Sequence, residues 1–125
     1  MTAFESLTAF QRETEALSRI AGRLGWDQET VMPRGAAAQR GEEMAAIEGV
    51  LHARRTDPRL SDWLAAAEAP DAAGAAQLRE IARAHARAVK VPGTLAQAIA
   101  RTTSLAQGIW AEARARDDVA HFLPT

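Results

Sequence analysis

The chain has 125 residues, a net charge of -1 and no cysteine, which fits one domain and excludes a disulfide framework, thiolate catalysis and cysteine-ligated zinc. Its 15 basic residues are balanced by 16 acidic ones, so we expect no nucleic-acid partner. The amino-terminal residues lack the basic and apolar regions of a signal peptide, and no apolar run approaches membrane-spanning length. We therefore expect a cytoplasmic protein without a membrane partner.

A long first helix is predicted over residues 3–30. Thr2 and Glu5 have the spacing of a capping box at its start. Pro33 sets its end, because proline pushes the residue before it out of the helical region. Apolar or small residues recur at steps of three and four along one face, namely Phe4, Leu7, Phe10, Thr14, Leu17, Ala21 and Leu24.

A second helix is predicted over residues 37–54. Arg54 and Arg55 form the densest basic cluster, which we interpret as a solvated helix end. Asp57 and the proline after it predict a third helix over residues 58–69, because aspartate caps helices and proline suits the first helical position. The second helix turns three apolar residues inward, namely Met44, Ile47 and Leu51.

A fourth helix is predicted over residues 72–90, with Asp71 as its cap and His85 as a half-buried structural residue on its apolar stripe. A fifth helix over residues 95–116 is expected to open with a second capping box at Thr94. Its predicted inward stripe consists of Leu95, Ile99, Thr102, Ala106, Ile109 and Ala113.

No segment alternates apolar and polar residues as a half-buried strand would. We therefore predict an all-α fold, an array of about five helices whose short connections favour antiparallel neighbours. Residues 1–125 form a single helical region in this interpretation. The segment from Glu68 to Gly74 is expected to be a turn between helices, and no element is expected beyond Asp118.

The sequence shows no catalytic constellation. His52, His85 and His121 stand too far apart for a His-Glu-x-x-His zinc helix, and phosphate-binding and Gly-x-Ser-x-Gly motifs are missing. We therefore predict no catalytic residue and no metal ligand in this chain. No histidine stands at a sequence spacing that would let it activate Ser61 or the other serines. A contact between a serine and a histidine that the fold brings together is not excluded by this spacing. Glu48 and His52, four residues apart, are interpreted as an exposed helix pair.

Trp26 and Asp27 are the only candidates for substrate binding, and both are weak. One of three tryptophans stands beside an acid, and a second acid follows at Glu29. Residues two apart on a helix point to different sides, so the two acids would not cooperate. The structural alternative is that Trp26 packs in the core and Asp27 bonds to local backbone near the helix end. Both interpretations stay open.

Several further motifs follow this stretch. Together they read Leu24-Gly25-Trp26-Asp27-Gln28-Glu29-Thr30-Val31-Met32-Pro33 with Gly35 and Arg40, Leu51-His52, Thr56-Asp57-Pro58-Arg59-Leu60, Leu78-Arg79-Glu80-Ile81, Lys90-Val91-Pro92, and Trp110-Ala111-Glu112-Ala113-Arg114 with Asp117-Asp118, Phe122 and Pro124. In this order they closely resemble the N-terminal part of the carboxypeptidase Taq family of thermostable-type zinc metallocarboxypeptidases. The resemblance spans residues 17–124, and the number of separate motifs makes it specific.

The resemblance implies a mostly helical peptidase with a deep groove that its N-terminal helices partly cover. It also implies that the full-length parent uses a zinc-type divalent metal and releases C-terminal amino acids from peptide substrates. The family's zinc helix and substrate-carboxylate residues lie beyond position 125, so none is assigned here. We therefore expect this chain to be a wall or cover of the groove, with no cofactor of its own and inactive alone.

Alternatives remain. Met1 suggests a true start and Pro124-Thr125 a cut end, whether by engineering, proteolysis or a short gene product. Helices that normally pack on a larger body should expose an apolar face, which a homo-oligomer would hide. A second hypothesis is therefore a non-catalytic helical interaction or dimerisation module. A third, an unrelated metal-binding bundle, lacks the ligand spacing.

Overall fold

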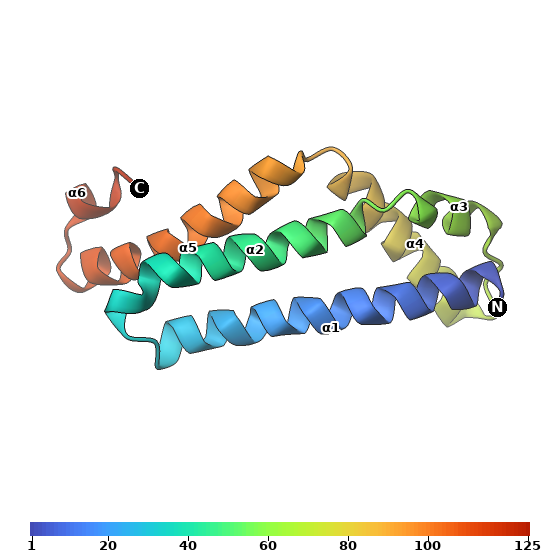
Figure 1. The fold of residues 1–125 in the computed structure, drawn as a ribbon, viewed down its shortest axis with the longest axis horizontal. Coiled ribbons are helices and arrows are strands. Elements are labelled where there is room, and N and C mark those ends of the chain that lie inside the picture. Colours follow the sequence, from blue (N-terminus) through green and yellow to red (C-terminus); the bar gives the residue numbers. More distant parts are fainter.

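The computed structural model describes residues 1–125 and is built from helices and short connections (Figure 1). No strand forms, so the predicted all-α class is confirmed. The elements are α1 (Ala3–Thr30), the 3-10 helix η1 (Arg34–Ala36), α2 (Ala37–Arg55), α3 (Arg59–Ala66), α4 (Ala72–Ala88), α5 (Gly93–Ala115) and α6 (Val119–Phe122).

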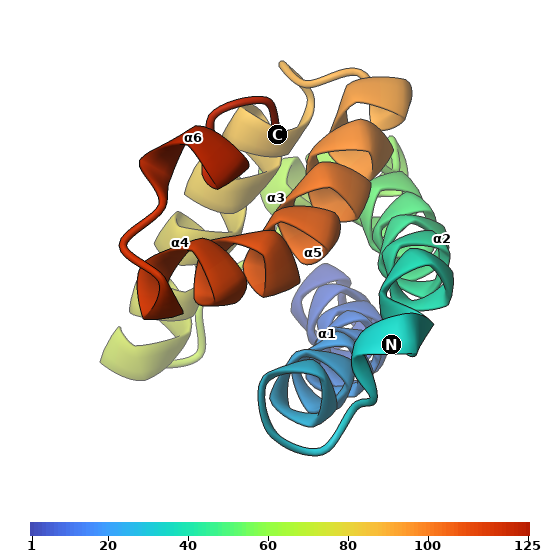
Figure 2. The same cartoon turned by 90° about the vertical axis from the view of Figure 1, so that its left-hand side faces the viewer.

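Three long helices form the body of the molecule. In Figure 1, α1, α2 and α5 run lengthwise, with α2 antiparallel to both of the others. Helices α3 and α4 lie at the end where the chain begins, α3 against α1 and α4 against α2 and α3. In the end-on view of Figure 2, α1 lies below α5, and α2 lies to one side of both. The most extensive interhelical contact is between α2 and α5, whereas α1 and α5 make no extensive contact.

At three of the four helix starts where the sequence predicts a cap, a side chain accepts a hydrogen bond from a backbone N–H, and one of these is Asp57 Oδ1, which accepts from Arg59 N–H over 2.9 Å. Glu5 N–H donates to Thr2 Oγ1 over 3.2 Å and Thr2 N–H to Glu5 Oε2 over 2.7 Å, so the first capping box is confirmed. Asp71 accepts from Gly74 N–H over 2.7 Å. The capping box at Thr94 was wrong, because α5 already begins at Gly93, after Pro92, without a side-chain cap.

One helix was missed at the carboxyl end. After α5 the chain reverses through Asp117, whose φ of 52° lies in the left-handed region. Asp118 then caps α6 by accepting from His121 N–H over 3.2 Å. An aspartate before a short apolar stretch was the available signal. The four residues of α6 are too few to show the helical spacing of apolar residues from which a helix is predicted.

The contact between α2 and α5 uses small residues. Gly41 of α2 is buried, and a Cβ placed on it would lie 3.3 Å from Leu105 Cγ of α5. The prediction that α5 turns Leu95 and Ile99 inward was wrong, because these side chains are 49% and 54% exposed. The helix instead presents small residues that allow close approach, and its buried positions are Ala96, Ser104 and Ala113.

An arginine joins α1 to the carboxyl end of α2. Arg54 Nη2 donates to the Phe10 carbonyl over 2.9 Å and Arg54 Nε to Thr14 Oγ1 over 2.9 Å. Its guanidinium lies 3.9 Å from the centroid of the Phe10 ring, which packs in turn on Trp63 of α3 at 5.6 Å. The expectation of a solvated helix end was wrong for Arg54, because cation–π and hydrogen-bond partners on α1 draw it inward.

The helices leave much of their surface uncovered. Only 10 of 125 residues are buried, and the accessible area is 8071 Å². A compact monomer of 13.4 kDa would expose about 6,500 Å². The excess is therefore roughly 1,600 Å². No helix is both long and apolar enough to cross a membrane. The large apolar side chains left exposed include Ile20, Trp26, Val31, Val50, Leu95, Ile99 and Trp110.

Candidate functional site

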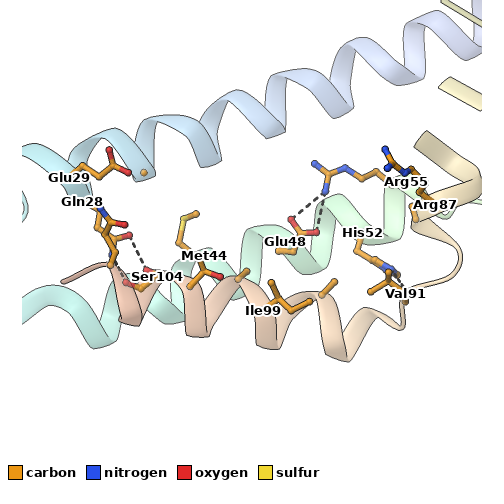
Figure 3. Close-up of a pocket in the computed structure, with 16 residues that line it drawn as sticks. Gln28, Glu29, Met44, Glu48, His52, Arg55, Arg87, Val91, Ile99 and Ser104 are labelled. Carbon is orange, nitrogen blue, oxygen red and sulfur yellow. Dashed lines mark hydrogen bonds and ion pairs between the residues drawn. The ribbon is translucent and has the colours of Figure 1, made fainter. Parts of the chain in front are cut away.

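An open trough of about 640 Å³ lies between α1, α2 and α5, and the end of α4 borders it (Figure 3). It exists because α1 and α5 both pack on α2 but make no extensive contact with each other. Its central lining side chains are Gln28 of α1, Met44, Glu48 and His52 of α2, and Ile99 and Ser104 of α5.

A pair of hydrogen bonds ties α1 to α5 at one end of the trough. Gln28 Nε2 donates to the Ser104 carbonyl over 2.6 Å, and Ser104 Oγ donates to Gln28 Oε1 over 3.0 Å. Ser104 is buried, so both of its polar groups find partners inside the protein. This amide therefore fixes the separation of two helices that otherwise have little contact.

The opposite end of the trough is polar but internally paired. His52 Nε2 donates to the Val91 carbonyl over 2.6 Å, and the Glu48 carboxylate pairs with Arg55 at 3.1 Å. The predicted Glu48–His52 pair was wrong, because each side chain has a partner from elsewhere. Glu48 retains 26% side-chain exposure, which leaves the ion pair on the trough wall rather than in the core.

The Asp27 carboxylate holds α1 to α2. Asp27 Oδ2 accepts from Arg40 Nη2 over 2.7 Å, and Arg40 Nη1 donates to the Leu24 carbonyl over 2.5 Å. Arg40 Nε binds Glu43 at 2.8 Å, and the Arg40 side chain is only 11% exposed. Hydrogen bonds from Arg40 to Asp27 first and Glu43 second raise the pKa of the guanidinium. The interpretation of Asp27 as a local backbone acceptor was wrong, because its partner lies thirteen residues away.

Trp26 does not pack in the core, because it is 64% exposed. It does not line the trough either. The structure therefore separates the two candidates: Asp27 is engaged in an ion pair with α2, and Trp26 faces outward beside it. Substrate contact by either residue stays a prediction. Glu29, the second acid of the stretch, does line the trough.

A serine–histidine pair that sequence spacing did not reveal lies between α3 and α4. His85 Nδ1 donates to the Arg55 carbonyl over 2.8 Å, which leaves Nε2 to accept from Ser61 Oγ over 3.1 Å. A nucleophile would also need an oxyanion site. The backbone amides of residues 59–61 all donate to the two residues that precede α3. The pair therefore joins α2, α3 and α4, and the prediction of a half-buried structural histidine is confirmed.

The side chains of this chain do not form a metal site. No group of three or more histidine, cysteine, aspartate and glutamate side chains is arranged to hold a metal ion. At least three protein ligands are typical of a catalytic zinc site. The residues present therefore do not fit a resident catalytic metal, and no reaction step is assigned to them.

The fold and site define a helical segment whose long helices α1, α2 and α5 enclose an open trough. The sequence model described as carboxypeptidase Taq (M32) metallopeptidase matches residues 6–125. The chain belongs to this family.

Two relatives place the segment within longer proteins. The chain is 39% identical over 128 residues to thermostable carboxypeptidase 1 of Thermus thermophilus, which covers 98% of this chain and 25% of the relative. It is 26% identical over 124 residues to thermostable carboxypeptidase 1 of Pyrococcus furiosus, covering 96% of this chain and 25% of that protein. The chain thus spans about a quarter of the length of these relatives.

Proposed function

We propose that this chain is the N-terminal helical part of a metal-dependent carboxypeptidase that releases C-terminal amino acids from peptides. The observation that supports this proposal most directly is the family match over residues 6–125, in a chain that has no group of side chains able to hold a metal. In this proposal a zinc-type divalent ion and the catalytic residues belong to the remainder of the enzyme. This segment forms a wall or cover of the active-site groove and is inactive alone.

The openness of the structure supports a role as one wall of a larger body. A surface excess of roughly 1,600 Å² is what helices expose when they lack the elements they pack on. A wall contributes to catalysis by excluding water and by limiting the approach of substrate, and it needs no catalytic residue for either task.

A peptidase assay tests the proposed inactivity. The purified 125-residue chain is incubated with a blocked dipeptide and zinc or cobalt, and release of the C-terminal amino acid is measured beside full-length thermostable carboxypeptidase 1 of Thermus thermophilus. We expect turnover at the level of the buffer control, because no side-chain cluster holds the metal. Metal-dependent turnover that scales with the concentration of the chain would overturn the proposal of inactivity.

A second candidate function is a non-catalytic helical interaction or dimerisation module. The specific observation in its favour is the exposure of large apolar side chains on α1 and α5, with Trp26 at 64% and Ile99 at 54%. The source gene separates the two candidates. A His-Glu-x-x-His motif downstream in the same reading frame supports the peptidase, whereas a stop codon after Thr125 favours the module.

A further inference from the structure

The trough carries two charged side chains without partners. Glu29 of α1 and Arg87 of α4 are both exposed and both line the trough, and neither makes a side-chain hydrogen bond or ion pair. Figure 3 shows them at opposite ends, with Glu29 near Gln28 and Arg87 near Arg55. The other two ionic groups of the trough, Glu48 and Arg55, are already paired with each other.

Between the two charges the trough is lined mainly by apolar and small side chains. Met44 of α2 and Ile99 of α5 project into it, and alanines of α5 form part of the wall. Small residues allow the backbone of another helix to approach closely. Along α2 the lining runs from Met44 to Arg55, a rise of about 16 Å or three helical turns.

The uncovered area indicates that the occupant is large and permanently attached. A standard interface between separate proteins takes roughly 800 Å² from each partner, and the excess surface here is about twice that. The relatives carry about three quarters of their length outside the matched part. The remainder of the enzyme is therefore the occupant that supplies enough surface.

We propose that the trough seats one amphipathic helix, about three turns long, from the remainder of the carboxypeptidase. Its apolar stripe lies on Met44 and Ile99, a basic side chain pairs with Glu29, and an acidic side chain pairs with Arg87. Opposite free charges at the two ends fix the direction in which the helix lies, because the reversed helix would bring like charges together. This inference rests on the proposed function and specifies the surface by which the segment joins the enzyme.

The test uses a full-length chimera in which this chain replaces the matching N-terminal quarter of thermostable carboxypeptidase 1 of Thermus thermophilus. Ile99→Asp and Arg87→Glu are introduced into the trough. The matched controls are Val50→Asp, which is 48% exposed on α2 outside the trough, and Arg83→Glu one turn before Arg87 on α4. Rates of thermal inactivation are measured in the chimera, and unfolding temperatures are measured in the 125-residue chain.

We expect both trough variants to speed inactivation of the chimera about ten-fold or more. Ile99→Asp would bury an unpaired carboxylate under the docked helix. Arg87→Glu would face the acidic side chain that pairs with Arg87. The controls should change the rate less than about three-fold. In the 125-residue chain, diluted until it is monomeric, Ile99→Asp should leave the unfolding temperature near that of Val50→Asp, since both side chains are about half exposed there. A large effect of Ile99→Asp in the chimera, together with a small effect in the 125-residue chain, shows that Ile99 stabilises the docking of the segment and not its internal fold.

Three results would overturn the inference. If the chimera is active and all four variants inactivate at the same rate, the docking surface is wrong and the proposed function stands. If Ile99→Asp abolishes self-association of the 125-residue chain and spares the chimera, the occupant is a second copy. If the chimera folds but lacks peptidase activity, the proposed function fails and the docking inference fails with it.

Discussion

Arginine side chains make many of the long-range connections between the helices of this chain. Arg54 joins α2 to α1, Arg40 joins α2 to the end of α1, and Arg101 of α5 binds Glu42 of α2 at 2.7 Å. The guanidinium group suits this task, because its fixed fork of donors reaches several acceptors at once. Such connections compensate in part for a core in which only ten residues are buried.

Arg40 should be the most sensitive of these arginines to substitution. It is 11% exposed and donates to Asp27, Glu43 and the Leu24 carbonyl, so Arg40→Ala leaves the half-buried carboxylate of Asp27 without its partner. We expect a loss of about 2–3 kcal/mol in the free energy of unfolding, measured by urea denaturation. Arg19→Ala is the control, because its 72% exposed pair with Glu15 should contribute less than about 0.5 kcal/mol. Equal losses in the two variants would contradict the assigned role of Arg40.

Asp57 predicts a dependence of stability on pH. A side-chain hydrogen bond and then a backbone hydrogen bond from Arg59 lower the pKa of the Asp57 carboxyl to about 2, from an ordinary value of 3.8. Because the folded-state pKa is the lower one, the carboxylate stabilises the fold above about pH 4, and this contribution is lost as pH falls towards 2. Asp57→Ala should cost about 1 kcal/mol at neutral pH, as for other helix-capping aspartates.

Urea denaturation of the wild-type chain and the Asp57→Ala variant between neutral pH and pH 2 checks this prediction. The difference between the two midpoints should be constant in the upper part of this range and should shrink below about pH 4. A difference that stays unchanged down to pH 2 would show that Asp57 does not act through its charge.

At the scale of the elements, glycines have opposite roles in α1 and α2. Gly22 lies inside α1, and a Cβ placed on it would meet nothing within 4 Å, so the helix runs through this glycine at a cost in backbone entropy. Gly41 of α2 lies against Leu105, so its missing side chain is what allows α5 to approach. The same residue type is thus a weakness in one helix and a packing requirement in the other.

The two glycines should therefore respond in opposite directions. Gly22→Ala should raise the free energy of unfolding by about 0.5–1 kcal/mol, because alanine is the better helix former and the site is open. Gly41→Leu should lower it by about 1–3 kcal/mol, because the added atoms push α5 away from α2. Thermal unfolding followed by circular dichroism compares them. Stabilisation by Gly41→Leu would show that α2 and α5 are not closely packed in solution.

At the scale of the whole molecule, the apolar surface of α1 and α5 should drive self-association when the chain is alone. These two helices carry Ile20, Trp26, Leu95, Ile99 and Trp110, each between 45% and 64% exposed, and a second copy is the simplest way to cover such side chains. We expect the unfolding temperature to rise with protein concentration, since association stabilises the folded state by mass action. Sedimentation equilibrium measures the assembly directly. A strictly monomeric chain with a concentration-independent unfolding temperature would contradict this expectation.

Helix starts and ends were largely predictable because their signals are local. The box formed by Thr2 and Glu5, the cap at Asp71 and the stop before Pro33 each depend on side chains within a few residues of the backbone groups they satisfy. The helical class could be inferred in the same way. The family resemblance also needed only the order of motifs, and the match over residues 6–125 bears it out.

The direction in which each helix faces depended on partners far away in the chain. Ser104 finds Gln28 at a separation of 76 residues, and His85 finds Ser61 and the Arg55 carbonyl on two other elements. Small residues let α5 pack on α2 with Leu95 and Ile99 left outside, which no count of apolar positions along one helix reveals. Periodicity and capping are set within a few residues, whereas the trough arises only where three helices meet, and so only the tertiary structure could show it.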